Sequence, residues 1–430
     1  MKILWFANSP CGSVRRNNTK TIGGGWLISL EDEIKNYPDV ELSVAFFSNL
    51  KEEPYDYDGV HYYPMYFAQA NSKIGRVLDR YKSIESVDEE MLPIMLDVVK
   101  DVNPNLIHIH GTEERFGLIQ EYVKGVPVVF SIQGLIAPCT EKYFSGFPDK
   151  EVYGYESWKD KVRLVSYRND FGSFVERGKR ECGYLKKAQY VFGRTAWDEY
   201  ITGLMNNQRK YYVVDEIMRS PFYDKQWRKE NFSKAPFKIV STISGGIYKG
   251  YETVLRSAAL LKQYSGIDFE WIIAGYDQES KWVKIAEQYT KIKSDNVNIK
   301  LLGRIDAEQL SNLLADSDVY VHVSHIENSP NSVCEAMLVG MPIVASFAGG
   351  TASLLTTKKE GVLVQDGDPY VYAGAISYLY HHFDIAKSYG ENARRRALDR
   401  HNPKRIGRQL TDGYKTICEE YGKVKLRNRK

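Results

Sequence analysis

Short runs rich in β-branched and aromatic residues alternate with apolar residues at helical spacing along the whole chain. In the first half the strand-like runs are KILWF, LSVAFF, LIHIH and VPVVFSI, and residues 26–34 between the first two carry a helical apolar stripe. Strands that alternate with helices pair in parallel, because each helix returns the chain to the edge where the next strand begins. The alternation therefore predicts a parallel α/β sheet in this half.

A second series of the same kind follows a polar, proline-flanked connector near residues 216–236. Its strand-like runs are FKIVSTI, DFEWIIAG, NIKLLG, VYVHVS, PIVAS and GVLV. The chain has 430 residues, which is too long for one ordinary core and fits two domains. We predict an α/β fold in which two Rossmann-like domains face each other across a cleft. Residues 1–218 form the first domain and residues 219–394 the second, and residues 395–430 form a C-terminal helix that returns toward the first.

The composition excludes several classes of protein. Hydrophobic residues make up 43% and charged residues 26% of the chain, and no apolar run approaches the ~18 residues that cross a bilayer. The 5 cysteines are scattered without a CxxC pair, which argues against a zinc site or a disulfide framework and for the cytoplasm. A net charge of +3 gives no reason to expect a nucleic acid partner.

The stretch HIENSPNSVCEAMLVGMPIVASFAGG, residues 325–350, places two glutamates on either side of a Pro-Asn-Ser turn. Pro330 predicts that a helix begins there, because proline is favoured in the first turn. Glu327 is then expected on a loop and Glu335 just inside the helix, with both carboxylates facing one small volume. Glu327 has neither a capping role nor an evident ion-pair partner. Glu335 has a purely structural alternative, since Ser332 and Glu335 form the pattern of a capping box.

Polar residues surround this expected helix start. Backbone N–H groups in the first turn of a helix have no intrahelical acceptor and bind anions such as a diphosphate. The next strand ends on the same edge with Gly349 and Gly350. The polar residues are Asn328, Ser329, Asn331 and Ser332.

Glycine loops follow other strands. SGGIYKG, residues 244–250, ends the first strand of the second domain and places Lys249 where an ammonium group meets a phosphate, although most lysines are ordinary surface charges. TIGGGW, residues 21–26, has three glycines before a helix, and an ordinary flexible loop explains it equally well. LLGRID, residues 301–306, is a weaker signal of backbone groups that contact a nucleobase, and its Asp306 is expected to cap the next helix.

Two further patterns look like metal sites but have simpler explanations. Asp366 and Asp368 flank a glycine, yet Asp368 followed by proline fits a helix N-cap and its first residue. His108 and His110 share one face of a strand, and two histidines without a third ligand make zinc improbable.

Together these loops resemble the retaining family-4 glycosyltransferases of the GT-B fold, the group that builds bacterial polysaccharides and glycolipids. The resemblance covers nearly the whole chain and is strongest from 237 to 370, where the E-x7-E pattern precedes EAMLVGMPIVASFAGG. It implies that Glu327 lies beside the donor sugar hydroxyls, Glu335 binds the ribose and Lys249 binds the diphosphate. It also implies that the ends of the strands LIHIHG and VPVVFSIQGL line the acceptor side.

The resemblance assigns candidate roles to residues of this chain. The candidate catalytic residues are Glu327, Lys249 and Gln133. The acceptor-side residues are His110 and Gln133. The donor-binding residues are Gly23, Gly24, Gly25, Gly245, Gly246, Gly303, Arg304, Asn328, Ser329, Asn331, Ser332 and Glu335.

Three positions depart from the family pattern. An arginine that usually precedes the lysine is replaced by Gly245 and Gly246, which leaves Lys249 and helix amides to offset the pyrophosphate charge, with Arg304 as a further candidate. A histidine common on the acceptor side is replaced by Gln133, which can bond a hydroxyl but cannot exchange a proton. A glutamate that often follows the glycine pair is absent near Ser353.

The implied activity is transfer of a hexose from a nucleoside-diphosphate sugar to a saccharide or lipid-linked acceptor, with retention of anomeric configuration. No metal or cofactor besides the donor is expected, and the expected setting is cell-surface polysaccharide biosynthesis in the cytoplasm. Aromatic and basic residues in 141–187 suggest peripheral contact with the inner face of the membrane, and a solvated insertion explains them equally well. Two alternative functions stay open: a nucleotide-sugar epimerase or hydrolase, and a non-catalytic nucleotide-sugar-binding subunit.

Overall fold

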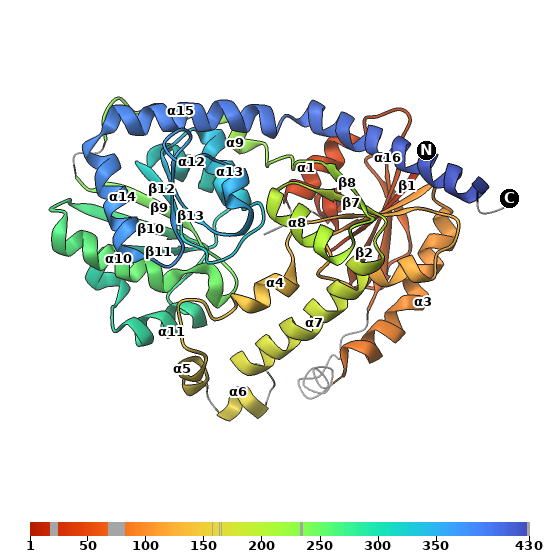
Figure 1. The fold of residues 1–430 in the computed structure, drawn as a ribbon, viewed down its shortest axis with the longest axis horizontal. Helices are drawn as coiled ribbons and strands as arrows, with labels where there is room; N and C mark the ends of the chain where they lie inside the picture. Colours follow the sequence, from red (N-terminus) through yellow and green to blue (C-terminus); the bar gives the residue numbers. More distant parts are fainter. Residues whose placement is uncertain are drawn as a thin grey trace. The chain divides into compact units, whose positions relative to one another are not determined.

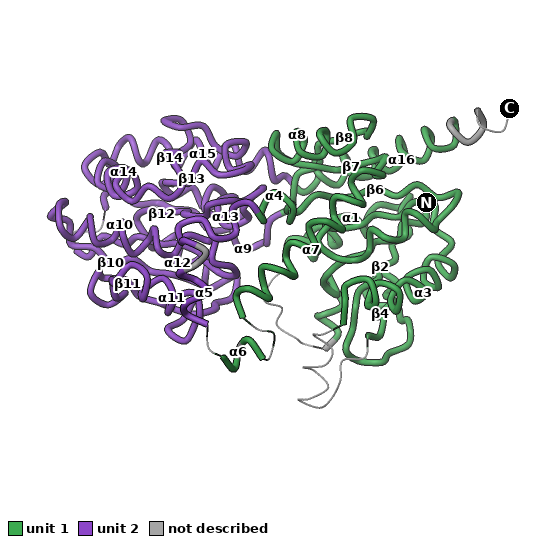
Figure 2. Tube along the Cα trace, turned by 60° about the horizontal axis from the view of Figure 1, so that its bottom comes forward, with its two compact units in different colours: residues 1–140, 157–217, 403–430 green, residues 141–156, 218–402 purple. Residues whose placement is uncertain are grey.

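The chain divides into two compact units, coloured separately in Figure 2. Unit 1 comprises residues 1–140, 157–217 and 403–430, and unit 2 comprises residues 141–156 and 218–402. The computed structural model describes residues 1–17, 25–67, 82–156, 158–162, 164, 166–232 and 235–427. Among the helices of this described part, none combines the length and apolar character needed to cross a membrane.

Unit 1 is built on an 8-stranded sheet in the order β3-β4-β2-β1-β5-β6-β7-β8. Neighbouring strands are parallel except β3 and β4, which form an antiparallel pair at one edge. Ligands of such sheets bind at the edge formed by the carboxyl ends of the parallel strands. The strands are β1 (Lys2–Ala7), β2 (Glu41–Ser48), β3 (Tyr55–Tyr57), β4 (Val60–Tyr66), β5 (Leu106–His110), β6 (Val128–Ser131), β7 (Tyr190–Gly193) and β8 (Lys210–Val213).

Helices cover both faces of this sheet (Figure 1). Side chains alternate between the faces of a strand, so Ile3 and Trp5 pack with α1 and α16, whereas Leu4 and Phe6 pack with α3 and α7. The helices and 3₁₀ turns are η1 (Cys11–Asn17), α1 (Gly25–Ile34), α3 (Ile84–Val102), η2 (Arg115–Glu121), α4 (Ile136–Glu141), α6 (Trp158–Val162), α7 (Tyr167–Lys187), α8 (Ala196–Met205) and α16 (Pro403–Arg427).

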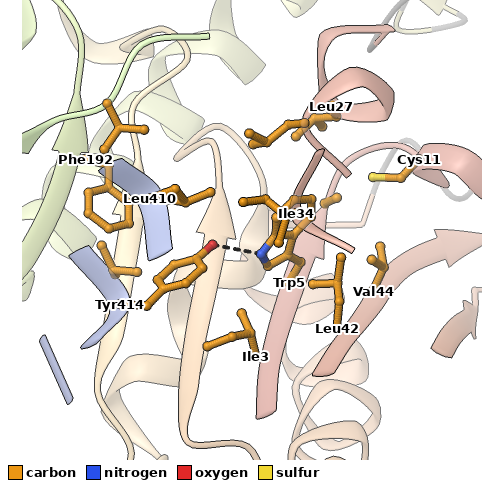
Figure 3. Close-up of a cluster of buried hydrophobic side chains, with 14 of the residues drawn as sticks. Ile3, Trp5, Cys11, Leu27, Ile34, Leu42, Val44, Phe192, Leu410 and Tyr414 are labelled. Atoms are coloured by element: carbon orange, nitrogen blue, oxygen red, sulfur yellow. Dashed lines mark hydrogen bonds between the residues drawn. The ribbon is translucent and has the colours of Figure 1, made fainter. Parts of the chain in front are cut away.

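The C-terminal helix α16 belongs to the core of unit 1. The indole Nε1 of Trp5 donates a hydrogen bond of 2.9 Å to the hydroxyl of Tyr414, which lies on α16 (Figure 3). The same hydroxyl lies 2.6 Å from Nδ1 of His108 on β5. These buried polar contacts fix the last helix against the centre of the first sheet.

Unit 2 is built on a 6-stranded, wholly parallel sheet in the order β11-β10-β9-β12-β13-β14. Its strands are β9 (Phe237–Thr242), β10 (Phe269–Ala274), β11 (Ile299–Gly303), β12 (Val319–His322), β13 (Ile343–Phe347) and β14 (Val362–Gln365). Its helices and 3₁₀ turns are α5 (Asp149–Gly154), α9 (Pro221–Asp224), η3 (Ile247–Lys249), α10 (Tyr251–Tyr264), α11 (Lys281–Thr290), η4 (Ser294–Val297), α12 (Ala307–Asp316), α13 (Asn331–Val339), η5 (Gly349–Ser353), α14 (Pro369–His381) and α15 (Phe383–Arg400).

Each strand-like run of the sequence coincides with an observed strand, so the predicted pair of Rossmann-like α/β sheets is confirmed. The hairpin of β3 and β4 is not anticipated by the alternation. The structure also differs from the expected boundaries in two places, because residues 141–156 and 395–402 pack in unit 2. The first of these segments buries three aromatic side chains there, which a reading of strand and helix patterns does not reveal.

Candidate functional site

Three neighbouring strands of unit 2 bring the predicted donor-side residues together. Strands β9, β12 and β13 lie side by side and run in the same direction, so their carboxyl ends meet at one edge. The loop after β9 carries Lys249, the loop after β12 carries Glu327, and the loop after β13 carries Gly349 and Gly350. The fold therefore gathers in space the loops that are separated in the sequence.

Lys249 and Glu327 form an ion pair at this edge, with Lys249 Nζ donating to Glu327 Oε1. Lys249 ends η3, and Glu327 lies on the loop that leads into α13. Their side chains are only 22% and 19% exposed. The expectation that Glu327 has no ion-pair partner is therefore wrong, because its partner comes from a distant loop that no local pattern connects to it.

Glu327 is held in its ionised form. Burial favours the neutral carboxyl, but Lys249 and the nearby His322 outweigh burial and hold the pKa of Glu327 below its usual value. His322 Nε2 lies 4.0 Å from Glu327 Oε1, and His322 Nδ1 lies 3.1 Å from the hydroxyl of Ser346. Burial also lowers the pKa of His322 to about 4. At neutral pH the pair thus consists of a carboxylate and an ammonium beside a neutral imidazole.

Glycines let these loops approach one another's backbone. Gly349 has φ +52°, and a Cβ there would lie 1.9 Å from the carbonyl oxygen of Glu327. The N–H of Gly350 donates to that same oxygen at 2.9 Å. Gly250 has φ +80°, and a Cβ there would lie 2.2 Å from the carbonyl oxygen of Val323. Glycine is required at both positions because any larger residue would push apart the loops that carry the ion pair.

Glu335 is paired with an arginine rather than with the start of its own helix. Arg219 donates Nε and a terminal nitrogen to the two carboxylate oxygens at 2.7 and 2.8 Å. The helix α13 begins at Asn331 with Pro330 as N-cap and no side-chain cap, so the capping box of Ser332 and Glu335, the alternative explanation of Glu335, does not form. Burial raises the pKa of Glu335, and Arg219 offsets part of that rise.

The predicted helix start at Pro330 is confirmed, and its surroundings suit an anion. Asn331 and Ser332 occupy the first turn of α13, where backbone N–H groups lack intrahelical acceptors. Asn328 and Ser329 are buried on the preceding loop. The turn follows Glu327 on the same loop, so its amides lie at the sheet edge that also carries Lys249.

The remaining donor-side residues lie at the same sheet edge but not all near the ion pair. Gly245 and Gly246 directly precede η3, and the hydroxyl of Tyr276 donates to their carbonyl oxygens at 3.1 and 3.2 Å. Gly303 ends β11, and β10 separates β11 from β9. Arg304 follows it as an exposed side chain, and its role in donor binding stays a prediction.

Residues of both patterns that look like metal sites have structural roles. The carboxylate of Asp368 accepts from the backbone N–H groups at 370 and 371 and caps α14, with proline as the first helical residue, as predicted. His108 bonds to Tyr414 and to Ser131, both at 2.6 Å. Asp306 caps α12 in a capping box with Gln309, which confirms its expected role.

The acceptor-side candidates lie at the carboxyl edge of unit 1. His110 ends β5 and is 1% exposed, and burial together with Arg194 lowers its pKa to about 3. Among the described residues, neither ring nitrogen of His110 has a hydrogen-bond partner. Gln133 lies just after β6, the neighbour of β5. Gly25 is the first residue of α1, whereas the predicted residues Gly23 and Gly24 lie outside the described part of the chain.

Sequence reasoning missed three residues that shape these edges. Arg219 pairs with Glu335, and His322 lies beside Glu327, although both lie outside the E-x7-E pattern. The residues next to them in the sequence give no indication of these contacts. Glu113 follows β5 by three positions, which places it at a ligand-binding edge and is a usable signal. Burial raises the pKa of Glu113 to about 7, and its Oε2 has no hydrogen-bond partner in the part of the chain that the structure describes.

Residues 223–396 match the sequence model of the family described as glycosyl transferases group 1, so the match falls within unit 2. An uncharacterized glycosyltransferase of Methanocaldococcus jannaschii is 28% identical over 286 residues, which cover 64% of this chain and 69% of that protein. The amylovoran biosynthesis glycosyltransferase AmsK of Erwinia amylovora is 27% identical over 34% of this chain and 36% of its own length.

Solved structures of other proteins share the fold of the whole chain. A sucrose-phosphate synthase from Thermosynechococcus elongatus is 16% identical and has a TM-score of 0.68 over 97% of this chain and 98% of its own. HepE from Anabaena, solved with UDP-glucose, is 18% identical and has a TM-score of 0.63 over 97% of this chain and 100% of its own. The α/β fold of two Rossmann-like domains, the GT-B class predicted from the sequence, is confirmed.

Proposed function

We propose that this chain is a glycosyltransferase that moves a hexose from a nucleoside-diphosphate sugar to a saccharide or lipid-linked acceptor. The observation that carries the proposal is the Lys249–Glu327 ion pair, held by glycine loops within the stretch that matches glycosyl transferases group 1. HepE, which has this fold, was solved with UDP-glucose, and this supports a uridine nucleotide as the first donor to test. The likeness to AmsK, an amylovoran biosynthesis enzyme, supports polysaccharide synthesis as the setting.

The leaving diphosphate is the group that needs the most stabilisation. In our proposal it draws the ammonium of Lys249 away from Glu327 and accepts from the N–H groups of Asn331 and Ser332 in the first turn of α13. Fixed donors of this kind neutralise the developing charge without a metal ion. The proposal therefore expects turnover to persist in excess EDTA.

Glu327 then acts on the sugar itself. Its ionised carboxylate positions the donor hydroxyls and stabilises the positive charge that develops at the anomeric carbon. In the proposed retaining mechanism, the acceptor hydroxyl attacks from the face that the diphosphate leaves. The departing phosphate takes the acceptor proton. Gln133 hydrogen-bonds the acceptor hydroxyl and exchanges no proton.

One experiment tests this function against its alternatives. The protein is incubated with UDP-, GDP- and ADP-sugars, with and without a saccharide acceptor, and the released nucleotide and the sugar products are measured. Nucleotide release that depends on acceptor, with an unchanged anomeric configuration by NMR, supports the proposal. Acceptor-independent release or an epimerised sugar indicates a hydrolase or an epimerase, and tight binding without turnover indicates a binding subunit.

We also propose peripheral contact with an anionic membrane through α6. Trp158 and Val162 lie four positions apart on this helix and are 70% and 59% exposed, with exposed Lys159 and Lys161 between them. Aromatic and basic side chains in this arrangement suit a lipid headgroup region. Co-sedimentation with phosphatidylserine vesicles should fall with added salt and with Trp158→Ser, and salt-independent or absent binding contradicts the contact.

A further inference from the structure

His325 lies at the centre of a buried charge cluster in unit 2. Its side chain is 2% exposed, and that of Glu252 is 1% exposed. The imidazole Nε2 lies 2.7 Å from Glu252 Oε1, and Nδ1 lies 3.4 Å from Asp366 Oδ2. Both ring nitrogens therefore face carboxylates, which requires a proton on each nitrogen and makes the ring a cation. Its partners come from the first turn of α10 and from the loop after β14.

The backbone of His325 joins the two loops that carry the ion pair. Its N–H donates to the carbonyl oxygen of Tyr248 at 2.9 Å, and Tyr248 directly precedes Lys249. Glu327 follows His325 by two residues on the same loop. A residue anchored on both sides in this way fixes the distance between the loop of Lys249 and the loop of Glu327.

The segment 141–156 packs directly on this cluster. A Cβ at Gly146 would lie 2.4 Å from Glu252 Oε1 and 3.0 Å from His325 Nε2, so the segment approaches the charged groups as closely as glycine allows. Lys142 lies 3.8 Å from Asp366 in an ion pair. The cluster therefore fastens an otherwise separate segment to unit 2.

Aromatic side chains extend the contact to the lysine loop. Tyr143, Phe144 and Phe147 are buried, although each belongs to a stretch with little regular structure. The ring of Tyr143 lies 6.0 Å from that of Tyr248, and the ring of Phe147 lies 4.9 Å from that of Tyr289. The segment thus presses on the residue next to Lys249.

We propose that His325 is a positioning residue for sugar transfer: its two carboxylate contacts fasten segment 141–156 and the Lys249 loop to the Glu327 loop, so that the ion pair meets the donor in one geometry. This inference rests on the proposed function and deepens it. It gives a role to His325, which precedes the E-x7-E pattern and is not part of it.

The surroundings of His325 keep it charged over most of the pH range. Burial lowers its pKa, but Asp366 and Glu252 outweigh burial and raise the pKa to about 9. The other titratable groups that act on the two carboxylates are Lys142, beside Asp366, and the hydroxyls of Tyr372 on α14 and Tyr276 after β10. Above pH 9 a neutral ring donates to only one carboxylate, and the fastening weakens.

The experiment compares His325→Gln, which removes the charge, with Gly146→Ala, which displaces the segment and keeps every charge. The exposed His382, which lies between α14 and α15, provides the matched control His382→Gln. Hydrogen–deuterium exchange protection factors of residues 141–156 and 244–250 are measured at pH 7 and pH 9.8, without substrate. The KM and kcat for UDP-glucose are measured from pH 6.5 to 9.8.

Both variants should lower the protection factors of these two segments about tenfold at pH 7. In His325→Gln the buried carboxylates lose their cationic partner, and in Gly146→Ala the segment 141–156 is displaced from the cluster. The wild type and Gly146→Ala should lose further protection at pH 9.8, and His325→Gln should not. KM should rise in His325→Gln at pH 7 and stop depending on pH, with kcat changed less than KM. The inference is overturned if His325→Gln leaves the protection factors unchanged. It is also overturned if the protection factors of the two variants depend equally on pH.

A failure of the proposed function gives a different result. If the wild type turns over no nucleotide sugar, the exchange data alone still decide whether His325 fastens these segments. If turnover is present and KM in His325→Gln follows the wild-type pH profile while exchange changes, His325 stabilises the fold and does not position the donor site.

Discussion

The carboxyl edges of the two sheets share one architecture but differ in the charge state of the groups named here. In unit 2, charged side chains are paired with opposite charges: Lys249 with Glu327 and Arg219 with Glu335. In unit 1, burial raises the pKa of Glu113 and of Glu181 to about 7 and, together with Arg194, lowers that of His110 to about 3. Paired charges that can exchange partners suit a diphosphate, whereas neutral or half-protonated groups both donate to and accept from hydroxyls.

In our proposal, this difference assigns the donor to unit 2 and the acceptor to unit 1. An anionic donor needs a cation that is held in place yet available, and an ion pair of partly exposed side chains supplies it. The hydroxyl groups of a saccharide acceptor carry no charge, so they need hydrogen-bond donors and acceptors and no cation. Substitutions at both edges can test this division.

Glu327→Gln should have the largest effect on catalysis. The amide keeps the shape but removes the negative charge, so turnover should fall by roughly 100- to 1,000-fold while nucleotide affinity changes little. Steady-state kcat and a calorimetric Kd for UDP measure the two quantities. Glu279→Gln, at a site whose side chain is 88% exposed, is the matched control. Unchanged turnover removes Glu327 from the mechanism.

Arg219→Met should destabilise unit 2 because it leaves the carboxylate of Glu335, 5% exposed, without its cation. Breaking such a pair lowers the free energy of unfolding by about 3 kcal/mol, whereas replacing both partners is far milder. Urea unfolding of Arg219→Met and of the double variant Arg219→Met/Glu335→Met measures this. If the double variant is as unstable as the single one, the pair does not act as a unit.

Lys249→Met should weaken nucleotide binding by roughly 10- to 100-fold, because the diphosphate loses a charge-assisted donor. The free carboxylate of Glu327 then repels the diphosphate as well, so added salt should recover part of the loss. Lys284→Met on α11, whose side chain is 53% exposed, controls for the loss of a surface charge. Equal losses in the two variants contradict a specific role for Lys249.

Glu113→Gln should produce the smallest change, and it tests whether unit 1 holds a buried protonated carboxyl group. The folded pKa of Glu113, about 7, is raised above the usual 4.5, so the folded state binds more protons between these values. Stability contributed by this group is therefore present at low pH and lost as pH rises through 7. The fall in Tm from pH 5 to pH 8 should be smaller in Glu113→Gln than in the wild type, and an identical fall contradicts a buried protonated carboxyl.

The sequence predicts the features of these edges that depend on local residues. Strands and glycine turns follow from local periodicity and backbone geometry, so the sheets, the cap at Asp368 and the helix start at Pro330 were predictable. The partner of Glu327 was not, because pairing with Lys249 depends on the lateral order of β9 and β12. The capping box of Ser332 and Glu335, the structural alternative considered for Glu335, does not form for a related reason: the distant Arg219 donates to Glu335 instead.

Segment 141–156 shows the limit most clearly. Its aromatic and basic residues resemble an interaction surface, and Trp158 nearby is indeed exposed, yet Tyr143 and Phe147 are buried in unit 2. Sequence periodicity says which residues are apolar but not which of two cores receives them. Residues 142–148, which hold Tyr143 and Phe147, lack regular secondary structure and so offer no periodicity to decide it.

A crystal structure of the protein with UDP bound is the sharpest test of the proposed donor site. We expect the diphosphate within hydrogen-bond distance of Lys249 Nζ and of the first amides of α13, with Glu327 released from the lysine. Nucleotide bound away from this edge, or bound there with the Lys249–Glu327 pair still intact and no contact to the ammonium group, contradicts it.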